Sequence, residues 1–359
     1  MPSPRTIYLL TVLAVCQLIS TSGKSAEAAS EGVGAGATGF ISVKPGPEDL
    51  IRLPGTPWII VSSLRTPEGM PGELSVADVT RPEANAKRLT LVSNRASEID
   101  SEADATCHEP PDASKFFPHG INVRRKSEGE FRLYVVNHGG REAIEIYDID
   151  VHANDLSAIW RGCIQMPPNT WPNGVAPLPG KGIVVSSMYD PADRFIEKFA
   201  AGLPTGRVWS WRPDTGWKWA SGKELSGANG VEASPDGRFL FVSEWSRRRL
   251  WRFPLNGRGD GRFIDVDFLP DNLRWSTDGQ LLVAGQNARP EEVFGCTSKP
   301  ASCPIRFTVA AINPGTMTEQ KLIVEGDERF GGATAAIRVA QELWLGRFFG
   351  GTLARYRAP

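Results

Sequence analysis

The sequence predicts an all-β protein, built as a six-bladed β-propeller and closed by an N-terminal strand. Three observations carry this prediction. A similar hairpin phrase recurs along the chain, short apolar runs without helical periodicity lie between its copies, and 37 glycines and 28 prolines supply the turns. Repeats of this kind are typical of radial or stacked β architectures. A β-sandwich is the alternative fold, but it would leave the repetition of the hairpins unexplained.

Each copy of the phrase begins with a polar residue, continues as an apolar strand, turns, and returns as a second apolar strand. The clearest copies read HGINVRRKSEGEFRLYVVNH from His119, PNGVAPLPGKGIVVSSM from Pro172, ANGVEASPDGRFLFVSEW from Ala228 and PDNLRWSTDGQLLVAGQN from Pro270. A further unit starts near Glu48, and GGATAAIRVAQELWLGRFFGGTLARYRAP forms a sixth. Six units of about four strands each make six blades. The strand GFISVK is expected to complete the last blade and remove its exposed edge.

The composition is that of an ordinary globular protein. Of 359 residues, 41% are hydrophobic and 23% are charged, and the formal net charge is −1. A balanced charge without a basic run gives no support for a nucleic-acid partner. The length suits one large all-β domain or two smaller ones. We place a single propeller domain at residues 39–359.

The first 28 residues have the pattern of a secretory signal segment. Arg5 precedes an apolar run over residues 7–19, and AEA at 26–28 has the form of a cleavage site. Residues 29–38 are mostly small and are predicted to form a flexible linker. The apolar run is shorter than a membrane span, so the protein is expected to be secreted or periplasmic. Membrane attachment is the alternative, if the segment is retained as an anchor.

The cysteines agree with export. Removal of the signal segment leaves four, an even number, which favours disulfides in an exported protein. Cys296 and Cys303 lie in one loop, GCTSKPASC, and could pair with each other, in which case Cys107 would pair with Cys163. Three connectivities are open. Zinc binding is the rival interpretation, but it is weakly supported because no CxxC unit is present.

Polar side chains recur at one position of the hairpins. In an antiparallel hairpin, the start of the first strand and the end of the second lie at the same edge. A radial array would therefore bring the following side chains to one mouth of the ring: His119, His138, Asn173, Asn229, Asp271 and Asn272. A single asparagine before a strand is usually a turn residue. Its recurrence at one hairpin position favours a binding site instead.

Several phrases in a fixed order resemble a known superfamily. They are GPEDL, FPHGI, VVNH, NGVEASPDG and PDNL, and the similarity spans residues 40–359. The chain resembles the calcium-dependent six-bladed propellers that include paraoxonases, gluconolactonases and strictosidine synthase-like proteins. Within that superfamily, it resembles paraoxonases most closely.

The resemblance implies one central Ca²⁺, held by side chains that fall by motif on Glu48, Asn173, Asn229, Asp271 and Asn272. The chemistry agrees, because Ca²⁺ takes about six to eight oxygen ligands and accepts amide carbonyls as well as carboxylates. Glu48 and Asp271 would balance the two charges of the ion. The resemblance also implies a histidine dyad, His119 in FPHGI and His138 in VVNH.

The chain departs from the paraoxonase pattern at a second, structural calcium site. That pattern uses an aspartate, here Asp49, and another aspartate directly after the blade-three asparagine, where this chain has Gly174. A glycine offers only its carbonyl oxygen. The second site is therefore expected to be weaker, differently liganded or absent.

These features favour an exported calcium-dependent hydrolase that acts on a small-molecule lactone or related ester. His119, oriented by His138, is the predicted general base acting on water, and Asp271 is the rival base or nucleophile. Three tryptophans next to the predicted ligands are candidates for lining an apolar substrate pocket: Trp171, Trp245 and Trp275.

Two other classes of function stay open. A propeller of this kind can hold calcium and a small ligand without turnover, because propellers host many functions. A strictosidine synthase-like enzyme would instead form a carbon–carbon bond with a glutamate as catalyst. The phrases HGI and VVNH favour the hydrolase.

Overall fold

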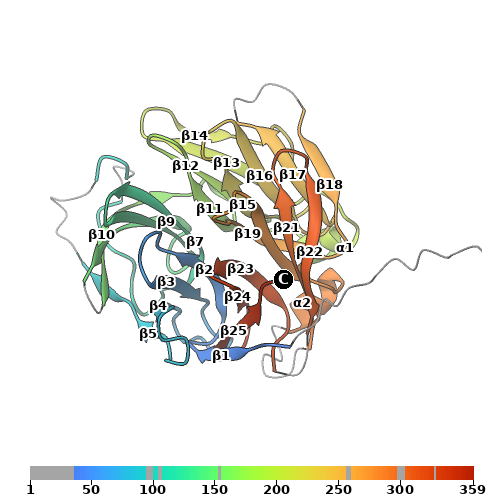
Figure 1. Ribbon diagram of the computed structural model, residues 1–359. Helices are drawn as coiled ribbons and strands as arrows, with labels where there is room; N and C mark the ends of the chain where they lie inside the picture. The colour runs from blue at the N-terminus through green and yellow to red at the C-terminus, as the bar shows by residue number, and fades with distance from the viewer. Residues whose placement is uncertain are drawn as a thin grey trace, which may run out of the picture. The chain divides into compact units, whose positions relative to one another are not determined.

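Six β-sheets follow one another in chain order, and each is one blade of a propeller (Figure 1). The strands of each blade are given from the axis outward. Blade 1 consists of β2 (Pro47–Arg52), β3 (Trp58–Ser63), β4 (Glu73–Asp78) and β5 (Lys87–Arg88), and blade 2 of β7 (Pro118–Ser127), β8 (Glu130–Asn137), β9 (Ala143–Val151), β10 (Leu156–Gln165) and β6 (Thr90–Val92). Blade 3 consists of β11 (Pro172–Pro177), β12 (Ile183–Ser187), β13 (Arg207–Arg212) and β14 (Gly216–Trp219). Blade 4 consists of β15 (Ala228–Ala233), β16 (Phe239–Glu244), β17 (Arg249–Pro254) and β18 (Arg262–Asp265), and blade 5 of β19 (Leu269–Trp275), β20 (Leu281–Gln286), β21 (Phe307–Asn313) and β22 (Thr318–Glu325). Blade 6 consists of β23 (Ala333–Val339), β24 (Glu342–Arg347), β25 (Thr352–Arg357) and β1 (Gly39–Ser42).

The structure is a computed structural model that describes residues 36–93, 100–103, 107–152, 155–255, 260–296, 304–326 and 329–359. All of them belong to the compact unit Val33–Pro359. The predicted signal segment, residues 1–28, and the predicted linker as far as residue 35 lie outside the described residues. No helix within the described ranges is long and apolar enough to cross a membrane.

The ring closes in two ways. The innermost strands β2, β7, β11, β15, β19 and β23 each contact the innermost strands of both neighbouring blades, and β23 contacts β2. The N-terminal strand β1 pairs antiparallel with β25, with Phe40 opposite Ala354. The last blade therefore combines both ends of the domain. This confirms the predicted fold class and its closure by an N-terminal strand.

Apolar side chains fill every interface between adjacent blades. Six clusters of buried residues each combine two neighbouring blades, and the sixth joins blade 6 to blade 1. Strand β3 shows why such strands read as continuous apolar runs. Its side chains alternate between faces, so that Ile59 and Val61 pack toward blade 6 while Trp58 and Ile60 pack toward blade 2. All six residues of β3 are buried because both of its faces meet a blade.

A register irregularity lies near the start of each innermost strand. The pairing with the second strand skips one or two residues directly after the first paired residue in β2, β7, β11, β15 and β23, and after the second in β19. Such bulges re-aim side chains. The glycines of the repeated phrases belong to the same feature. A Cβ at Gly120 would overlap the carbonyl oxygen of Asn173, and one at Gly230 would overlap that of Asp271. Only glycine lets these strands approach so closely at the axis.

The predicted pairing of Cys107 with Cys163 is confirmed by a disulfide that joins them, with their Cα atoms 5.5 Å apart. Cys163 lies in β10, so the bond ties the segment before β7 to the outer part of blade 2. Cys296 is also disulfide-bonded. Its expected partner, Cys303, lies outside the described residues.

Candidate metal and catalytic site

The six innermost strands surround the axis of the ring (Figure 1) and begin at one of its mouths. Each contributes one polar side chain there. In each strand, the residues skipped by the bulge include this polar residue. Together these side chains surround a cavity of about 130 Å³, in blade order Glu48, His119, Asn173, Asn229, Asp271 and Thr334. The structure therefore brings five residues predicted from the sequence to one place. Thr334 is the sixth member, which sequence reasoning missed.

Four oxygens in this cavity are buried and have no hydrogen-bond partner. They belong to four of the five predicted calcium ligands, namely Oε2 of Glu48, Oδ1 of Asn173, Oδ1 of Asn229 and Oδ1 of Asp271. An unsatisfied buried polar atom costs about 1–3 kcal/mol, so four together indicate a missing partner. No cluster of three or more His, Cys, Asp or Glu side chains suited to a metal occurs in the described ranges. The donor set here is instead two carboxylates and amide oxygens, which fits Ca²⁺.

Each carboxylate has one oxygen fixed by an amide donor. Asn272 Nδ2 donates to Glu48 Oε1 at 2.7 Å, and Gln286 Nε2 donates to Asp271 Oδ2 at 2.8 Å. Trp245 in turn donates its indole N–H to Gln286 Oε1 at 3.0 Å. The second oxygen of each carboxylate is the one left without a partner. This is the orienting support that metal ligands usually have. Asn272, a predicted ligand, acts in this structure as a support for Glu48.

Burial raises the pKa of both carboxylates in the metal-free site. It raises the pKa of Glu48 well above the ordinary range, and the nearby carboxylates of Asp49 and Asp271 raise it further. Burial likewise raises the pKa of Asp271 to about 7. Both carboxylates therefore bind protons more tightly than free side chains do. A divalent cation in the cavity would reverse this effect.

A relay of three side chains reaches the cavity from one side. His119 Nδ1 lies 3.0 Å from His138 Nε2, and His138 Nδ1 lies 2.6 Å from Glu142 Oε2. If His138 donates to Glu142 and His119 donates to His138, Nε2 of His119 keeps its lone pair. That atom lies 3.7 Å from Glu48 Oε1, at the cavity. The order of contacts thus leaves a proton acceptor facing the site.

The pKa shifts favour neutral histidines in this relay. Burial lowers the pKa of His119 well below the ordinary range, and the neighbouring His138 adds to the effect. Burial also lowers the pKa of His138 to about 3. It raises the pKa of Glu142 to about 8, and a protonated Glu142 would donate to His138 and reverse the relay. Nε2 of His119 is therefore available to accept a proton when Glu142 is ionised.

Three supporting residues escaped the sequence analysis. Thr334 occupies the hairpin position of the predicted ligands, and alignment of the sixth unit with the others could have found it. Glu142 follows His138 by four residues in NHGGRE. Gln286 is the last residue of β20, the second strand of the blade 5 hairpin. His138 has the corresponding place in blade 2, directly after the second strand β8. Nothing local in the sequence distinguishes Glu142 or Gln286 from ordinary polar residues.

Aromatic side chains form one wall of the mouth. Trp171 stacks on His138 with ring centroids 3.9 Å apart and on Tyr189 at 5.6 Å, and Tyr189 stacks on Phe195 at 3.9 Å. Phe195 begins helix α1 (Phe195–Ala200), which contacts helix α2 (Pro290–Cys296). Both helices follow the second strand of their blades, and this places them at the same mouth. The stacked ring faces make this wall largely apolar.

Two of the three tryptophans predicted to line the pocket lie there. Trp171 and Trp245 border the cavity. Trp275, the third candidate, does not border it, because it ends the innermost strand β19 and lies at a different cavity at the opposite mouth. Its indole N–H is donated to the carbonyl of Ala233 at 2.9 Å.

The residues present do not fit a second divalent ion beside Asp49. Gly174 supplies no side-chain oxygen, and Asp49 is already engaged by a cation of the chain itself, the guanidinium of Arg274. Its two carboxylate oxygens also accept the backbone N–H groups of Leu50 and Ile121, both at 2.8 Å. The expected weakness or absence of the second calcium site has this physical basis.

Comparisons with known proteins point to the same superfamily. The strictosidine synthase family model matches residues 184–258. Strictosidine synthase-like protein 4 of Arabidopsis thaliana is 35% identical over 28% of this chain and 27% of its own length. Strictosidine synthase of Catharanthus roseus is 30% identical over 34% of this chain and 36% of its own length. The matches thus span about a third or less of these relatives.

Similar solved structures cover nearly the whole chain at low identity. A luciferin-regenerating enzyme has a TM-score of 0.53 at 14% identity and covers 88% of this chain and 92% of its own. A protein assigned as a gluconolactonase has a TM-score of 0.51 at 14% identity and covers 90% of this chain and 93% of its own. Regucalcin, a calcium-binding protein of Agrobacterium tumefaciens, has a TM-score of 0.50 at 12% identity and covers 89% of this chain and 94% of its own. These likenesses concern the fold. With the sequence matches, they support the predicted superfamily, and the closer resemblance to paraoxonases stays a prediction.

Proposed function

We propose that the protein is an exported calcium-dependent hydrolase of lactones or related esters. The observation that carries the proposal is the convergence of four buried, unpartnered oxygens beside the nitrogen of a neutral histidine. The oxygens belong to Glu48, Asn173, Asn229 and Asp271. The strictosidine synthase-like relatives and the gluconolactonase-like and calcium-binding neighbours are consistent with an enzyme of this superfamily.

The four oxygens and the amide of Asn272 would hold the ion. When bound, Ca²⁺ would polarise the substrate carbonyl and stabilise the negative charge that develops on its oxygen. Asn272 and Gln286 would keep the two carboxylates oriented, as they do now through bonds of 2.7 and 2.8 Å. The buried charges of Glu48 and Asp271 would match the two charges of the ion.

His119 is the base that the geometry favours. Its Nε2 would take a proton from water while the water oxygen bonds to the carbonyl carbon. When the ring C–O bond breaks, the same proton would pass from Nε2 to the leaving alkoxide. His138 and Glu142 would hold the imidazole in the required tautomer. Asp271 is the weaker candidate, because Gln286 holds one of its oxygens and the other faces the predicted ion.

The surroundings of the site suit a small, partly apolar substrate. The cavity has a volume of about 130 Å³, and Trp171, Tyr189 and Phe294 belong to its lining. Removal of water from such a site strengthens the interactions of its charges. A short lactone or a small aryl ester is the class of substrate that fits these walls.

Export is part of the proposal. The disulfide between Cys107 and Cys163 suits an oxidising compartment, as does the signal-like pattern of residues 1–28. A secreted or periplasmic location would also supply calcium at the concentrations that weaker extracellular sites require.

An enzyme of the strictosidine synthase kind is the second candidate. The family-model match over residues 184–258 favours it. That stretch includes the blade 4 ligand Asn229 but neither histidine of the relay. A carbon–carbon bond-forming enzyme with a glutamate as catalyst would not need His119 as a base.

One experiment separates these functions from a calcium-binding propeller without turnover. A panel of lactones and aryl esters is offered to the mature protein with calcium, and again after chelation. We expect hydrolysis that disappears with the chelator and returns with added Ca²⁺. Hydrolysis that is indifferent to chelation would contradict the calcium role. A calcium-loaded protein inactive on the whole panel would favour the binding protein, or the synthase if a carbon–carbon bond is formed instead.

A further inference from the structure

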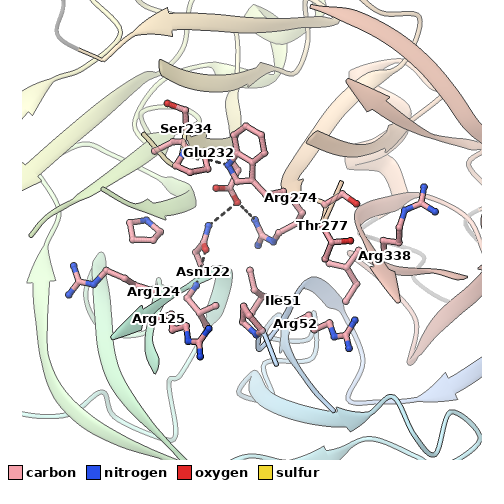
Figure 2. Close-up of a pocket in the computed structure, with 18 of the residues that line it drawn as sticks. Ile51, Arg52, Asn122, Arg124, Arg125, Glu232, Ser234, Arg274, Thr277 and Arg338 are labelled. Carbon is pink, nitrogen blue, oxygen red and sulfur yellow. Dashed lines mark hydrogen bonds and ion pairs between the residues drawn. The ribbon is translucent and has the colours of Figure 1, made fainter. Parts of the chain in front are cut away.

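The opposite mouth of the ring holds a second and larger cavity, of about 880 Å³ (Figure 2). All six innermost strands end there, and every blade contributes to the lining, with residues 51–52 and 54–55, 122–125, 177–179, 232–235, 274–277 and 337–338. Small-molecule sites typically have volumes of about 300–1,000 Å³. None of the predicted calcium ligands or relay histidines borders this cavity.

Buried polar residues close the cavity toward the axis. Asn122 Nδ2 donates to Glu232 Oε1 at 3.0 Å, and Arg274 Nη1 lies 3.5 Å from the same oxygen. Figure 2 shows these three side chains together at the centre of the pocket. Glu232 is the one carboxylate among the lining residues, and it is paired within this floor. The cavity is thus a closed cup rather than an open channel.

Arginines lie along one side of the cup, and in Figure 2 the side chains of Arg52 and Arg338 extend from the centre of the pocket toward its rim. Arg338, Arg52 and Arg125 lie at the ends of the innermost strands of three consecutive blades, 6, 1 and 2. Among the residues that the structure describes, Arg52 and Arg338 have no hydrogen-bond or ion-pair partner, and the Nε atom of each is buried and unsatisfied. Arg124 differs, because Glu102 binds its guanidinium at 2.6 and 2.7 Å. Two guanidinium groups on adjacent blades therefore lack an anion.

The other side of the cup is largely apolar. Blades 3 to 5 contribute Leu178, Pro179, Pro235 and Trp275, with the hydroxyl groups of neighbouring serine and threonine residues. The indole N–H of Trp275 is already donated to a backbone carbonyl. This half of the lining therefore offers mainly apolar surface, opposite the arginines.

We propose that the cup at the opposite mouth binds a small amphipathic organic dianion, with carboxylate or phosphate groups on an aromatic or aliphatic body. Guanidinium groups bind carboxylate and phosphate oxygens in pairs of parallel hydrogen bonds, and a concave site concentrates their positive potential. The apolar half would take the body of the ligand. The closed floor and the volume favour a small molecule over a macromolecule.

Titration calorimetry on the full calcium-loaded chain tests the site with four probes. They are benzene-1,3-dicarboxylate, phenyl phosphate, inorganic phosphate and the neutral benzene-1,3-dimethanol. We expect saturable binding of one molecule per chain for the first two, weaker binding of inorganic phosphate and none of the neutral analogue. The tighter of the two organic anions identifies the head group. Failure of both to saturate would overturn the proposal, as would equal binding of the neutral analogue.

Variants assign the binding to the cup. Arg52→Gln and Arg338→Gln should each lower the affinity for the organic dianion about tenfold or more, because each removes a charged donor. Arg52→Lys should lower the affinity less. Arg289→Gln is the control, since that side chain is 73% exposed next to α2, at the other mouth. Melting temperatures of the free variants should match the wild type. Unchanged affinity in the double Arg52 and Arg338 variant would overturn the assignment, as would binding of a polyglutamate peptide in place of the small dianions. The readout does not depend on hydrolysis.

Discussion

The carboxylate of Asp49 in blade 1 and the guanidinium of Arg274 in blade 5 form an ion pair on the propeller axis, where both side chains are almost fully buried. Arg274 also donates to the carbonyls of Leu273, Ile121 and Leu50, at 2.7, 2.6 and 3.2 Å. The pair therefore joins blades 1, 2 and 5 beneath the predicted calcium ligands. A fixed cation of the chain stands beside Asp49, where the paraoxonase pattern would place part of a second metal site.

Removal of the cation should destabilise the protein strongly. Arg274→Met leaves Asp49 buried without a counter-charge, and breaking a buried pair in this way costs about 3–5 kcal/mol. The free energy of unfolding in urea measures the loss. The double variant that adds Asp49→Leu should recover part of it, because no charge is then left unpaired. Arg238→Met is a matched control, since its pair with Asp236 is exposed to solvent and should contribute little to stability. Equal losses in the two single variants would contradict this account.

The metal content should be one tightly bound Ca²⁺ per chain, and not two. Glu48→Gln or Asp271→Asn should weaken binding, because each removes half of the charge that compensates a divalent ion. Asp278→Asn serves as a control, since Asp278 lies in the exposed turn between β19 and β20. Equilibrium dialysis followed by elemental analysis gives both the stoichiometry and the affinity. Zinc in place of calcium, or two calcium ions per chain, would contradict the site as described.

Calcium binding should also depend on pH near neutrality. Burial raises the pKa of Asp271 to about 7 in the metal-free site and that of Glu48 well above its ordinary range. Protonated carboxylates are poor ligands, so the apparent affinity should fall as the pH drops through about 7. Binding should release protons. Calorimetry in two buffers of different ionisation enthalpy measures that release, and an affinity unchanged between pH 8 and pH 6 would contradict it.

The hairpin repeat made the fold predictable because each copy encodes the same strand, turn and strand. The same copies located the mouth, since a polar residue recurs at the position where each innermost strand bulges. Glu142 and Gln286 were missed because their roles depend on contacts across a turn or along a returning strand. Trp275 is not at that mouth for a related reason. It lies only four residues after Asp271, but four residues of extended strand reach the opposite mouth of the ring.

Reduction of the confirmed disulfide should lower stability without destroying the fold. Cys107 and Cys163 are 56 residues apart in the sequence and are both buried. A cross-link of this kind contributes about 2–4 kcal/mol, mainly by restricting the unfolded chain. The double variant Cys107→Ser, Cys163→Ser should show that loss in urea unfolding, with turnover retained at low temperature. Peptide mapping without reductant should find Cys107 joined to Cys163 and no free thiol at Cys296. Four free thiols would contradict the pairing and weaken the case for export.

The relay from Glu142 through His138 to His119 predicts a graded set of catalytic losses. His119→Gln should lower lactone turnover by about 10²-fold or more, the scale of general-base catalysis, with calcium content and melting temperature unchanged. Glu142→Gln should lower it less, because the base remains and only its orientation is weakened. Since a protonated Glu142 would reverse the relay and burial raises the pKa of that carboxyl to about 8, the acid limb of kcat at saturating calcium should lie near pH 8. Glu142→Gln should change kcat and that limb while leaving calcium affinity unaltered, a result that a purely structural role would not give. Full activity in His119→Gln would transfer the base role to Asp271, and a kcat that does not change between pH 9 and pH 7 would contradict the relay.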